Sequence, residues 1–365
     1  MSALLSESYT FDPRPYYPLV STLKRFRDPL WTENGLTLVF AHGTGFHKEQ
    51  WEPTIDELLG FIAQQTPNKI RIREIWTIDA PNHGDAALLN EQALQYGYEL
   101  VFQWQEYARS IHAFLTGRGK TLLGNPDLSS EGKVMIGNFD FTSHTIVGIG
   151  HSMGAISLLL SLDFAPSLEN LFASIVLVEP MTMEPAAAAK GPANKLASGS
   201  ESRRDTWSSV EEAYRMLKAR RTWQVWDDRV LRIFVASGLR PLPTLEYPDI
   251  KDGVTLKCTR KQETAAYRDT HGWVTIYRGF KSYASRVRIH LYYGKIHDYI
   301  PGEVKEDVIN NASGGAQNLA SFGYIDGAGH TAPQHSPLGV AEKIFLALKA
   351  DANRARAESE FTAKL

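Results

Sequence analysis

The sequence predicts an α/β protein with a mostly parallel central sheet, flanking helices and one helical lid insertion. Three observations support this fold class. Short apolar runs bounded by turn residues alternate with segments of helical periodicity, as in parallel strands joined by helices. The stretch TIVGIGHSMGAISLLL, residues 145–160, places a glycine cluster and Ser152 between two apolar runs. From about 181 to 285 the alternation stops, and the sequence becomes alanine-rich, then charged and aromatic.

Six apolar runs have the length and composition of buried strands. They are LTLVFA (36–41), IREIWTID (72–79), HTIVGIG (144–150), SIVLVE (174–179), VRIHLYYG (287–294) and SFGYID (321–326). Between the second and third runs, apolar residues recur at steps of three and four, which predicts a helix with this face in the core. The residues of this face are Leu100, Trp104, Tyr107, Ile111 and Phe114.

The long insertion predicts a folded subdomain, because an unstructured loop of that size is uncommon inside a compact protein. We expect residues 1–180 and 286–350 to form the core and residues 181–285 to form a helical lid or cap. Residues 351–365 have the composition of a polar, solvated tail. Within the lid, SSVEEAYRMLKARRTWQVWDDRVLRIFVASGL predicts two helices. Residues 190–240 hold 11 Lys or Arg against 6 Asp or Glu, so the lid is locally basic.

Composition narrows the class of protein. The chain has 365 residues, is 43% hydrophobic and carries a formal net charge of −2, which gives no global attraction to nucleic acid. Cys258 is the single cysteine, so an internal disulfide is excluded and a reducing intracellular compartment is favoured. No uninterrupted run of 18 apolar residues occurs, and we expect no membrane span.

The C-terminal tripeptide predicts a location. Ala363, Lys364 and Leu365 fit the small, basic, leucine pattern of which SKL is the type case. This pattern is an address recognised by the peroxisomal import receptor. We therefore expect the protein in peroxisomes, and otherwise in the cytoplasm.

Ser152 is the predicted nucleophile. Residues 150–154, GHSMG, fit G-x-S-x-G between a β-type run and a helical run, which is the context that this motif requires. The alternative is a phosphate-binding turn, but the glycine spacing G-x-G-x-x-x-G departs from the dinucleotide pattern. Glu169, the nearest acidic residue for a ribose, lies in a predicted loop.

A serine nucleophile needs a base and oxyanion donors. His330 follows the last predicted strand, which is the position of the base in this chain order, whereas His335 falls at a helix entry. The predicted oxyanion donors are the amides of Met153 and of Thr44 in AHGTGF, with Gly45 as the next choice for the second donor.

Two residues compete for the orienting acid. Glu179 ends the apolar run SIVLVE, and an acid that closes a buried strand is costly unless it has a partner. Asp298 lies in the post-strand loop YYGKIHDYIP, 32 residues before His330. The sequence leaves both open, with a small preference for Glu179.

At this point the chain resembles the α/β-hydrolases over nearly its whole length. The motifs AHGTGFHKEQWEP, IDAPNHGDAA, GHSMGAISL, LVEPM, WDDRVL and GVTLKC, with the AKL ending, are similar to those of fungal peroxisomal α/β-hydrolases. That group includes lipase-like proteins, hydrolases of host-selective toxin biosynthesis and an acyl-CoA hydrolase of mycophenolic acid formation. The resemblance implies Ser152 as nucleophile, His330 as base, and Thr44 and Met153 as oxyanion donors. It also favours Glu179 as the acid.

We expect a serine hydrolase that cleaves an acyl-CoA thioester or an ester without a cofactor or metal, within peroxisomal secondary metabolism. A carboxylesterase, lipase or acyltransferase with the same triad is the alternative, and a non-catalytic ligand-binding homologue is the second. An intact serine, histidine and acid set disfavours the binder. If CoA is bound, its phosphates need cations from the lid. The candidates are Arg203, Arg204, Arg215, Lys218, Arg220 and Arg221. The aromatics expected to line or support the acyl pocket are Trp207, Trp223 and Trp226.

Overall fold

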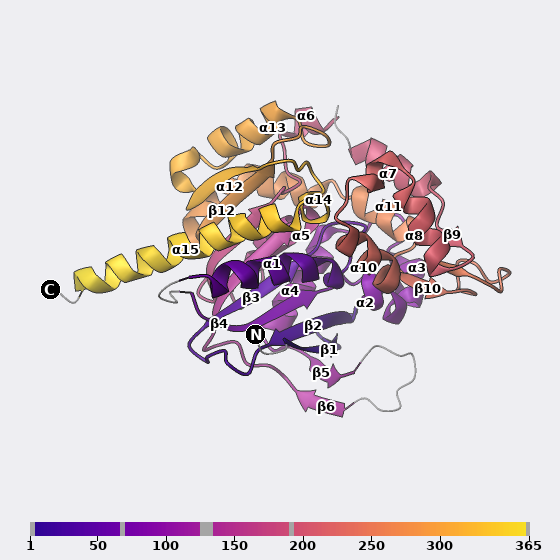
Figure 1. Cartoon of the computed structure of the whole chain (residues 1–365), viewed down its shortest axis with the longest axis horizontal. Coiled ribbons are helices and arrows are strands. Elements are labelled where there is room, and N and C mark those ends of the chain that lie inside the picture. The colour runs from indigo at the N-terminus through magenta and orange to yellow at the C-terminus, as the bar shows by residue number, and fades with distance from the viewer. Residues whose placement is uncertain (1–3, 66–69, 125–133, 190–192, 363–365) are drawn as a thin grey trace.

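A ten-stranded sheet runs through the middle of the protein (Figure 1). The computed structural model describes residues 4–65, 70–124, 134–189 and 193–362. The strand order is β13-β12-β8-β7-β3-β4-β2-β1-β5-β6. Neighbours from β13 to β4 pair in parallel, and neighbours from β4 to β6 pair in antiparallel. The parallel strands are β3 (Leu36–Ala41), β4 (Ile72–Ile78), β7 (Thr145–His151), β8 (Phe172–Val178), β12 (Ile289–Gly294) and β13 (Ser321–Ile325). The remaining strands are β1 (Leu5–Asp12), β2 (Ser21–Arg27), β5 (Lys120–Leu123) and β6 (Val134–Gly137).

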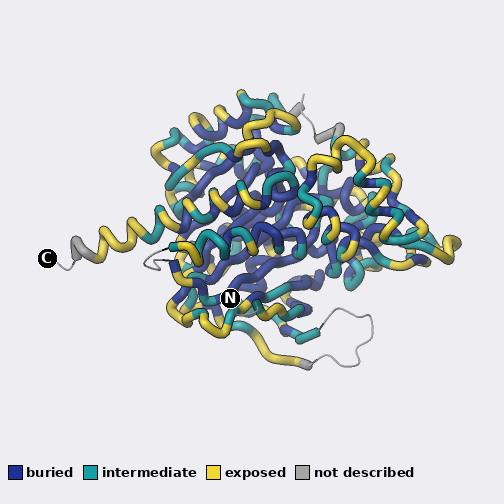
Figure 2. Tube along the Cα trace, viewed as in Figure 1, coloured by how far each residue is buried: buried dark blue, intermediate teal, exposed yellow. Residues whose placement is uncertain are grey.

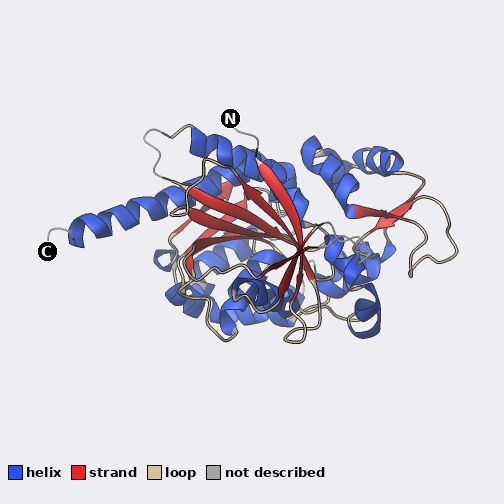
Figure 3. Ribbon diagram, turned by 90° about the horizontal axis from the view of Figure 1, so that it is seen from below, coloured by secondary structure: helices blue, strands red, loops and turns tan. Residues whose placement is uncertain are grey.

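Helices cover both faces of this sheet (Figure 3). On β3, Val39 and Ala41 belong to the core that includes α4, α5 and α12, while Leu38 and Phe40 belong to the core that includes α1 and α15. Both faces of each parallel strand are therefore buried, which explains the continuous apolar runs in the sequence. Figure 2 shows the buried residues concentrated on the sheet. The covering helices are α1 (Glu52–Ala63), α4 (Trp104–Leu115), α5 (Met153–Leu160), α12 (His271–Arg286) and α15 (Pro337–Thr362).

Short helices complete the connections of the core. They are α2 (Gly84–Leu89), α3 (Glu91–Gly97), α13 (Gly302–Asp307) and α14 (Ala332–His335), the 3₁₀ turns Lys48–Trp51, Ser161–Asp163 and Ala316–Asn318, and the π turn Val308–Ala312. The six predicted parallel strands are confirmed to within two residues at each end. The prediction for Leu100 was wrong, because α4 begins at Trp104 and Leu100 is 78% exposed. The carboxylate of Asp269 accepts a hydrogen bond from the Trp104 amide at 2.9 Å, which fixes this start of the helix.

The segment between β8 and β12 contains helices and a small second sheet. The three-stranded sheet has the order β10-β11-β9. Where the sequence predicted two helices, the structure has three, because a single turn, α9, separates α8 from α10. The elements before α12 are α6 (Pro185–Ala189), α7 (Ala193–Ser202), β9 (Thr206–Trp207), α8 (Val210–Lys218), α9 (Arg221–Gln224), α10 (Asp228–Gly238), β10 (Leu239–Pro241), β11 (Val254–Leu256) and α11 (Arg260–Tyr267).

This segment packs in two ways. Trp207, Leu231 and Leu256 belong to a separate apolar cluster formed mainly by α8, α10 and the small sheet. Helix α12, in contrast, buries Ile276 and Phe280 in the main core with α4 and α5. The stretch from β9 to β11 therefore has a cluster of its own, whereas Ala265 and Ala266 of α11 belong to the main core. In Figure 1 the stretch from β9 to β11 lies at one end of the molecule, opposite the projecting end of α15.

The last helix extends away from the body (Figure 1). Asp351, at the start of the predicted tail, still contacts the core, because its carboxylate lies 2.9 Å from the guanidinium of Arg288 and 3.2 Å from His290. Beyond it residues 353–359 are exposed, and the helix ends at Thr362. The tripeptide 363–365 lies outside the described residues. Within the described ranges, no helix is both long and apolar enough to cross a membrane.

Candidate functional site

Ser152 occupies a sharp turn between β7 and α5. Its backbone dihedral angles are φ 52° and ψ −117°, a region that costs energy for a residue with a side chain. Two flanking glycines allow the turn. A Cβ atom at Gly150 would lie 2.5 Å from the Cα of Ala155, and one at Gly154 would lie 2.3 Å from the carbonyl oxygen of Ala41. The turn thus holds the serine at the carboxyl end of the parallel sheet and the N-terminus of α5.

Ser152, His330 and Glu179 form one hydrogen-bonded chain. The Ser152 hydroxyl donates to Nε2 of His330 at 3.0 Å, and Nδ1–H of His330 donates to Oε2 of Glu179 at 3.2 Å. This assignment of the imidazole protons follows from the two partners. All three residues are buried, with exposed fractions of 6%, 6% and 0%. A hydroxyl beside a neutral imidazole that is oriented by a carboxylate is the arrangement that activates a serine nucleophile.

Glu179, like Ser152, has a positive backbone φ angle. Among the described residues, these two are the non-glycine positions with positive φ, at 49° for Glu179. Glu179 directly follows β8, and its amide continues the parallel ladder by donating to the carbonyl of Tyr292 at 2.8 Å. The amide of Gly294, at the end of β12, donates to Oε1 of Glu179 at 2.5 Å. Strained residues persist where the surrounding structure fixes them, and they concentrate at functional sites.

Asp298, the other predicted acid, binds the backbone of His330 and not its ring. The His330 amide donates to the two carboxylate oxygens of Asp298 at 2.9 and 3.1 Å. A Cβ at Gly329 would lie 2.2 Å from Oδ2 of Asp298, so the loop fits closely around this carboxylate. His335 lies on α14, where its Nε2 is 3.0 Å from the hydroxyl of Thr331. The structure thus places the carboxylate of Glu179 at the imidazole ring of His330. The carboxylate of Asp298 lies instead at the backbone amide of the same residue.

The loop that follows β3 presents backbone amides near the serine. A Cβ at Gly43 would lie 3.1 Å from the Cβ of Ser152, so this loop and Ser152 are in close contact. The Gly45 amide donates to Nε2 of His83 at 2.9 Å. Among the described residues, no acceptor binds the amide of Thr44. Met153 is the first residue of α5, where amides lack an intrahelical acceptor. Thr44 and Met153 are therefore available as donors, whereas the alternative, Gly45, is already engaged.

Buried histidines and ion pairs hold this loop. Burial lowers the pKa of His83 well below its usual range, so its ring is neutral and can accept the Gly45 amide. The ammonium of Lys48, which is 1% exposed, lies 2.9 Å from Asp79 and 2.7 Å from Asp85. Asp85 also pairs with Lys257, which precedes α11, at 2.5 Å. This network connects the loop after β3 to the segment between β8 and β12.

His151 holds the backbone of His330. Its Nε2–H donates to the carbonyl of His330 at 2.7 Å. Burial, with the neighbouring His330 as a second cause, lowers the pKa of His151 to about 3, so its ring is neutral near pH 7. The ring of Phe46 stacks on His151 with centroids 5.9 Å apart, and Trp226 packs edge-on against Phe46 at 5.7 Å. Trp226 in turn contacts Trp223 at 4.3 Å. An aromatic chain thus links the segment around α9 to the site, while Trp207 is buried in the separate cluster of that segment.

The six cations that the sequence proposes for CoA phosphates fall into two groups. Arg203 pairs with the buried carboxylate of Glu263, Arg204 pairs with Glu212 at 3.7 Å, and Lys218 pairs with Asp228 at 3.3 Å. Arg215, Arg220 and Arg221 are exposed, and within the described part of the chain none of them forms an ion pair. Among these six, the second group has no acidic partner in the described part of the chain and is free to meet an external anion.

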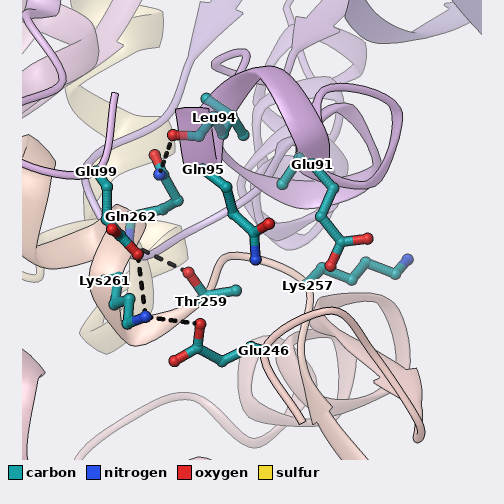
Figure 4. Close-up of a pocket in the computed structure, with 10 residues that line it drawn as sticks. Glu91, Leu94, Gln95, Glu99, Glu246, Lys257, Thr259, Lys261 and Gln262 are labelled. Carbon is teal, nitrogen blue, oxygen red and sulfur yellow. Dashed lines mark hydrogen bonds and ion pairs between the residues drawn. The ribbon is translucent and has the colours of Figure 1, made fainter. Parts of the chain in front are cut away.

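A small pocket between α3 and the start of α11 shows how the insertion is attached to the core (Figure 4). The ammonium of Lys261 lies 3.0 Å from Glu99 and 3.1 Å from Glu246, so it bridges the two sides of the pocket. None of the residues that line this pocket belongs to the Ser152 site. In the described ranges, no group of three or more His, Cys, Asp or Glu side chains has the arrangement of a metal site.

The sequence analysis missed three supporting residues. Asp79 directly follows β4 and could have been noticed as a buried acid, and His151 lies inside the serine motif. Lys305, which contacts Glu179, lies in the charged stretch GEVKED, which is typical of a solvated helix. Its burial depends on contacts between segments that are far apart in the chain.

The comparisons with known proteins agree with this architecture. The model of the alpha/beta hydrolase family matches residues 38–343. A type I acyl-CoA thioesterase of Penicillium brevicompactum is 28% identical over 221 residues, 60% of this chain and 43% of that protein. The peroxisomal membrane protein LPX1 of Saccharomyces cerevisiae is 30% identical over 152 residues, 42% of this chain and 32% of that protein. The matches thus span less than half the length of these relatives.

Solved structures show the same fold. The peroxisomal alpha-beta-hydrolase Lpx1 from Saccharomyces cerevisiae has a TM-score of 0.64 at 20% identity, covering 99% of this chain and 91% of that one. A thioesterase domain from the curacin biosynthetic pathway has a TM-score of 0.58 at 13% identity, covering 94% of this chain and 100% of that one. At these identities the likeness concerns the fold alone.

Proposed function

Because the chain belongs to the alpha/beta hydrolase family, we propose that it is a serine hydrolase that cleaves an acyl-CoA thioester, or an ester, through an acyl-enzyme intermediate. The observation that carries this proposal is the hydrogen-bonded chain from Ser152 through His330 to Glu179. Its order of elements is the one typical of this fold, with the nucleophile after a central strand and the histidine after the last strand.

In the first half of the reaction, the Ser152 hydroxyl attacks the acyl carbonyl while Nε2 of His330 takes its proton. The amides of Thr44 and Met153 donate hydrogen bonds to the oxyanion of the tetrahedral intermediate. The carboxylate of Glu179 holds the imidazole in the required tautomer and stabilises its cationic form. His330 then protonates the departing CoA thiolate or alkoxide, which leaves the acyl group on Ser152.

In the second half, His330 takes a proton from a water molecule that attacks the acyl-enzyme. The same amides stabilise the second oxyanion, and collapse of this intermediate returns the proton to Ser152. The products are a carboxylic acid and the free thiol or alcohol. These steps use no cofactor or metal.

The preference for a CoA thioester has two supports. One is the similarity to an acyl-CoA thioesterase over 60% of this chain. The other is the pair Arg220 and Arg221, which are exposed beside the aromatic segment that reaches the site. Exposed guanidinium groups suit the phosphates of CoA. In this proposal the part of the 181–285 insertion before α12 acts as the lid, and its aromatics Trp223 and Trp226 support the acyl pocket.

We place the reaction in peroxisomes. The support is the C-terminal Ala363-Lys364-Leu365 and the similarity to a yeast protein named for that organelle. A role in secondary metabolism would follow if the acyl group is that of a specialised metabolite.

A substrate panel tests the proposal. The purified chain and Ser152→Ala are assayed against straight-chain acyl-CoAs of increasing length, aromatic acyl-CoAs and neutral nitrophenyl esters, with released thiol or nitrophenol as the readout. We expect turnover of at least one acyl-CoA with a higher kcat/KM than the neutral esters, and none by Ser152→Ala. Turnover of neutral esters alone would make the protein a carboxylesterase, and turnover of no substrate would favour a ligand-binding homologue.

A further inference from the structure

Lys305 is a fully buried lysine that contacts the carboxylate of Glu179. It lies in α13, after β12, and its side chain is 0% exposed. Its ammonium donates to the carbonyl of Gly294 at 2.7 Å and to the carbonyl of Ile296 at 3.0 Å. The third contact is Oε1 of Glu179 at 3.2 Å. A lysine ammonium has three protons, so these three acceptors satisfy it completely and fix its position.

The two oxygens of Glu179 therefore have separate partners. Oε1 meets the Lys305 ammonium and the Gly294 amide, while Oε2 is left for Nδ1–H of His330. Gly294 contributes to both sides, because its amide binds Glu179 and its carbonyl binds Lys305. A Cβ at this glycine would lie 2.3 Å from the carbonyl oxygen of Ala328, so no larger residue fits there. With Oε1 fixed at two points, the orientation of the Oε2 lone pairs toward the imidazole is also fixed.

We propose that Lys305 is a positioning residue of the triad: its ammonium pairs with Oε1 of the buried Glu179 carboxylate and so aims Oε2 at His330. The inference rests on the proposed serine hydrolase function. A carboxylate with 0% exposure is costly unless a charged, hydrogen-bonded partner offsets its desolvation. At the start of the reaction His330 is neutral, so the positive partner of Glu179 in this state is Lys305.

The charged and titratable surroundings favour this role. Tyr293 presents its ring 5.7 Å from the Lys305 ammonium, and burial raises the pKa of its hydroxyl well above the usual range, so it brings no charge. Tyr299, whose pKa is raised by burial and then by Asp298, packs against the His330 ring at 6.0 Å. His151 is neutral, and the carboxylate of Asp298 accepts a hydrogen bond from the His330 amide. Within the described residues, Lys305 is thus the cation in contact with the Glu179 carboxylate.

The test compares Lys305→Met with Lys295→Met in the full-length protein. Methionine keeps the length of the side chain and removes its charge. Lys295 is a matched control, because it lies in the loop before α13, is 61% exposed and pairs with Asp326. For Lys305→Met we expect kcat to fall about 10²-fold, the effect of a misplaced catalytic group, with KM within about twofold of the wild type. Lys295→Met should match the wild type.

Two further readouts separate positioning from mere stability. First, the acid limb of the pH profile of kcat/KM should move to higher pH in Lys305→Met. The reaction needs an unprotonated imidazole beside an ionised carboxylate, and Lys305→Met removes a positive charge from this pair. Second, Lys305→Met should cost less than about threefold when it is added to Glu179→Gln, because residues that act through one another are not additive.

An unchanged kcat and pH profile in folded Lys305→Met would overturn the inference, as would full multiplication of the two effects in the double variant. If Lys305→Met does not fold, Lys305→Gln serves instead, since its amide can still donate to Gly294. Failure of both variants to fold would assign Lys305 to stability and reject the positioning role. Ser152→Ala tests the proposed function separately. If Ser152→Ala stays active, the triad assignment itself is wrong. If Ser152→Ala is inactive and Lys305→Met behaves like the wild type, only the inference about Lys305 is wrong.

Discussion

The carboxylate of Asp298 binds the backbone amide of His330, at 2.9 and 3.1 Å, while the imidazole of the same histidine faces Glu179. Two acids therefore serve one histidine at different places. Asp298 holds the loop that carries His330, and Glu179 is in position to orient its ring. The two contacts predict different consequences of removing each charge.

Glu179→Gln should be the severe variant. An amide at this position can no longer stabilise the imidazolium, and its nitrogen can turn toward Nδ1 and favour the wrong tautomer. In a serine protease the corresponding change lowers kcat about 10⁴-fold, and we expect a loss of that order. Steady-state kcat on the preferred acyl-CoA, with circular dichroism to confirm folding, provides the measurement.

Asp298→Asn should be mild by comparison. Asparagine keeps one oxygen that can accept the His330 amide, so about one hydrogen bond is weakened, which corresponds to about fivefold in kcat. The ranking of the two variants is the critical result. If Asp298→Asn proves the more damaging, Asp298 must reach the imidazole during turnover and the acid has been assigned to the wrong residue.

Reversal of Arg220 and Arg221 to glutamate should impair CoA substrates selectively. Exposed ion pairs are each worth up to about 1 kcal/mol, so we expect KM for an acyl-CoA to rise about tenfold and to depend less on salt. KM for a short neutral ester should change little. Arg118→Glu with Lys120→Glu is a control with the same charge change, at the exposed β5 end of the sheet. Equal damage to both substrates would indicate a folding defect, and damage to neither would leave CoA recognition without support from the lid.

Stability should fall as the pH drops below neutrality. The pKa of His151 is lowered from 6.5 to about 3 by burial, so between these values the unfolded chain binds a proton that the folded chain excludes. Folding is then opposed by about 1.4 kcal/mol per pH unit for this residue. Urea unfolding at pH 7, 6 and 5 measures the slope, which His151→Gln should reduce by about this amount. An equally steep slope in His151→Gln would assign the acid sensitivity to other groups, such as His42, whose pKa is also about 3 because of burial.

The tripeptide Ala363-Lys364-Leu365 should direct a fluorescent reporter into peroxisomes when it ends the fusion. The paired control is the same reporter without the last residue, which should stay in the cytosol. Colocalisation with a peroxisomal marker in cells gives the answer. A reporter that is cytosolic with and without the leucine would make this ending a coincidence.

The parallel half of the fold could be predicted because its strands are buried on both faces and leave uninterrupted apolar runs. The antiparallel half could not. Strand β2, STLKRFR, carries charges that suggest a surface segment, yet Lys24 pairs with Glu52 at 2.6 Å and Arg25 pairs with Glu74. These partners lie in α1 and β4, far from β2 in the sequence, so no local pattern predicts the pairs. The two-residue strand β9 is likewise fixed only by its pairing with β11.

The site divides in the same way. Ser152 and His330 occupy positions that a motif and chain order define, so the sequence could nominate them. The choice between Glu179 and Asp298 depends on which carboxylate reaches Nδ1 of the His330 ring and which reaches its backbone amide. These two groups of His330 lie only a few ångströms apart, a difference that no sequence pattern encodes. Lys305 could not be found, because only the contacts of α13 with the ends of β8 and β12 reveal that its charge is buried.

The most direct test of the account is the turnover and covalent labelling of Ser152→Ala beside the wild type. A fluorophosphonate probe should label the wild-type protein once, on the peptide that contains Ser152, and should not label the variant. The variant should lose kcat by about 10⁴-fold or more on the preferred acyl-CoA or ester, while its thermal unfolding stays cooperative. Hydrolysis by a folded Ser152→Ala at the wild-type rate, or a label mapped to another residue, would contradict the serine mechanism.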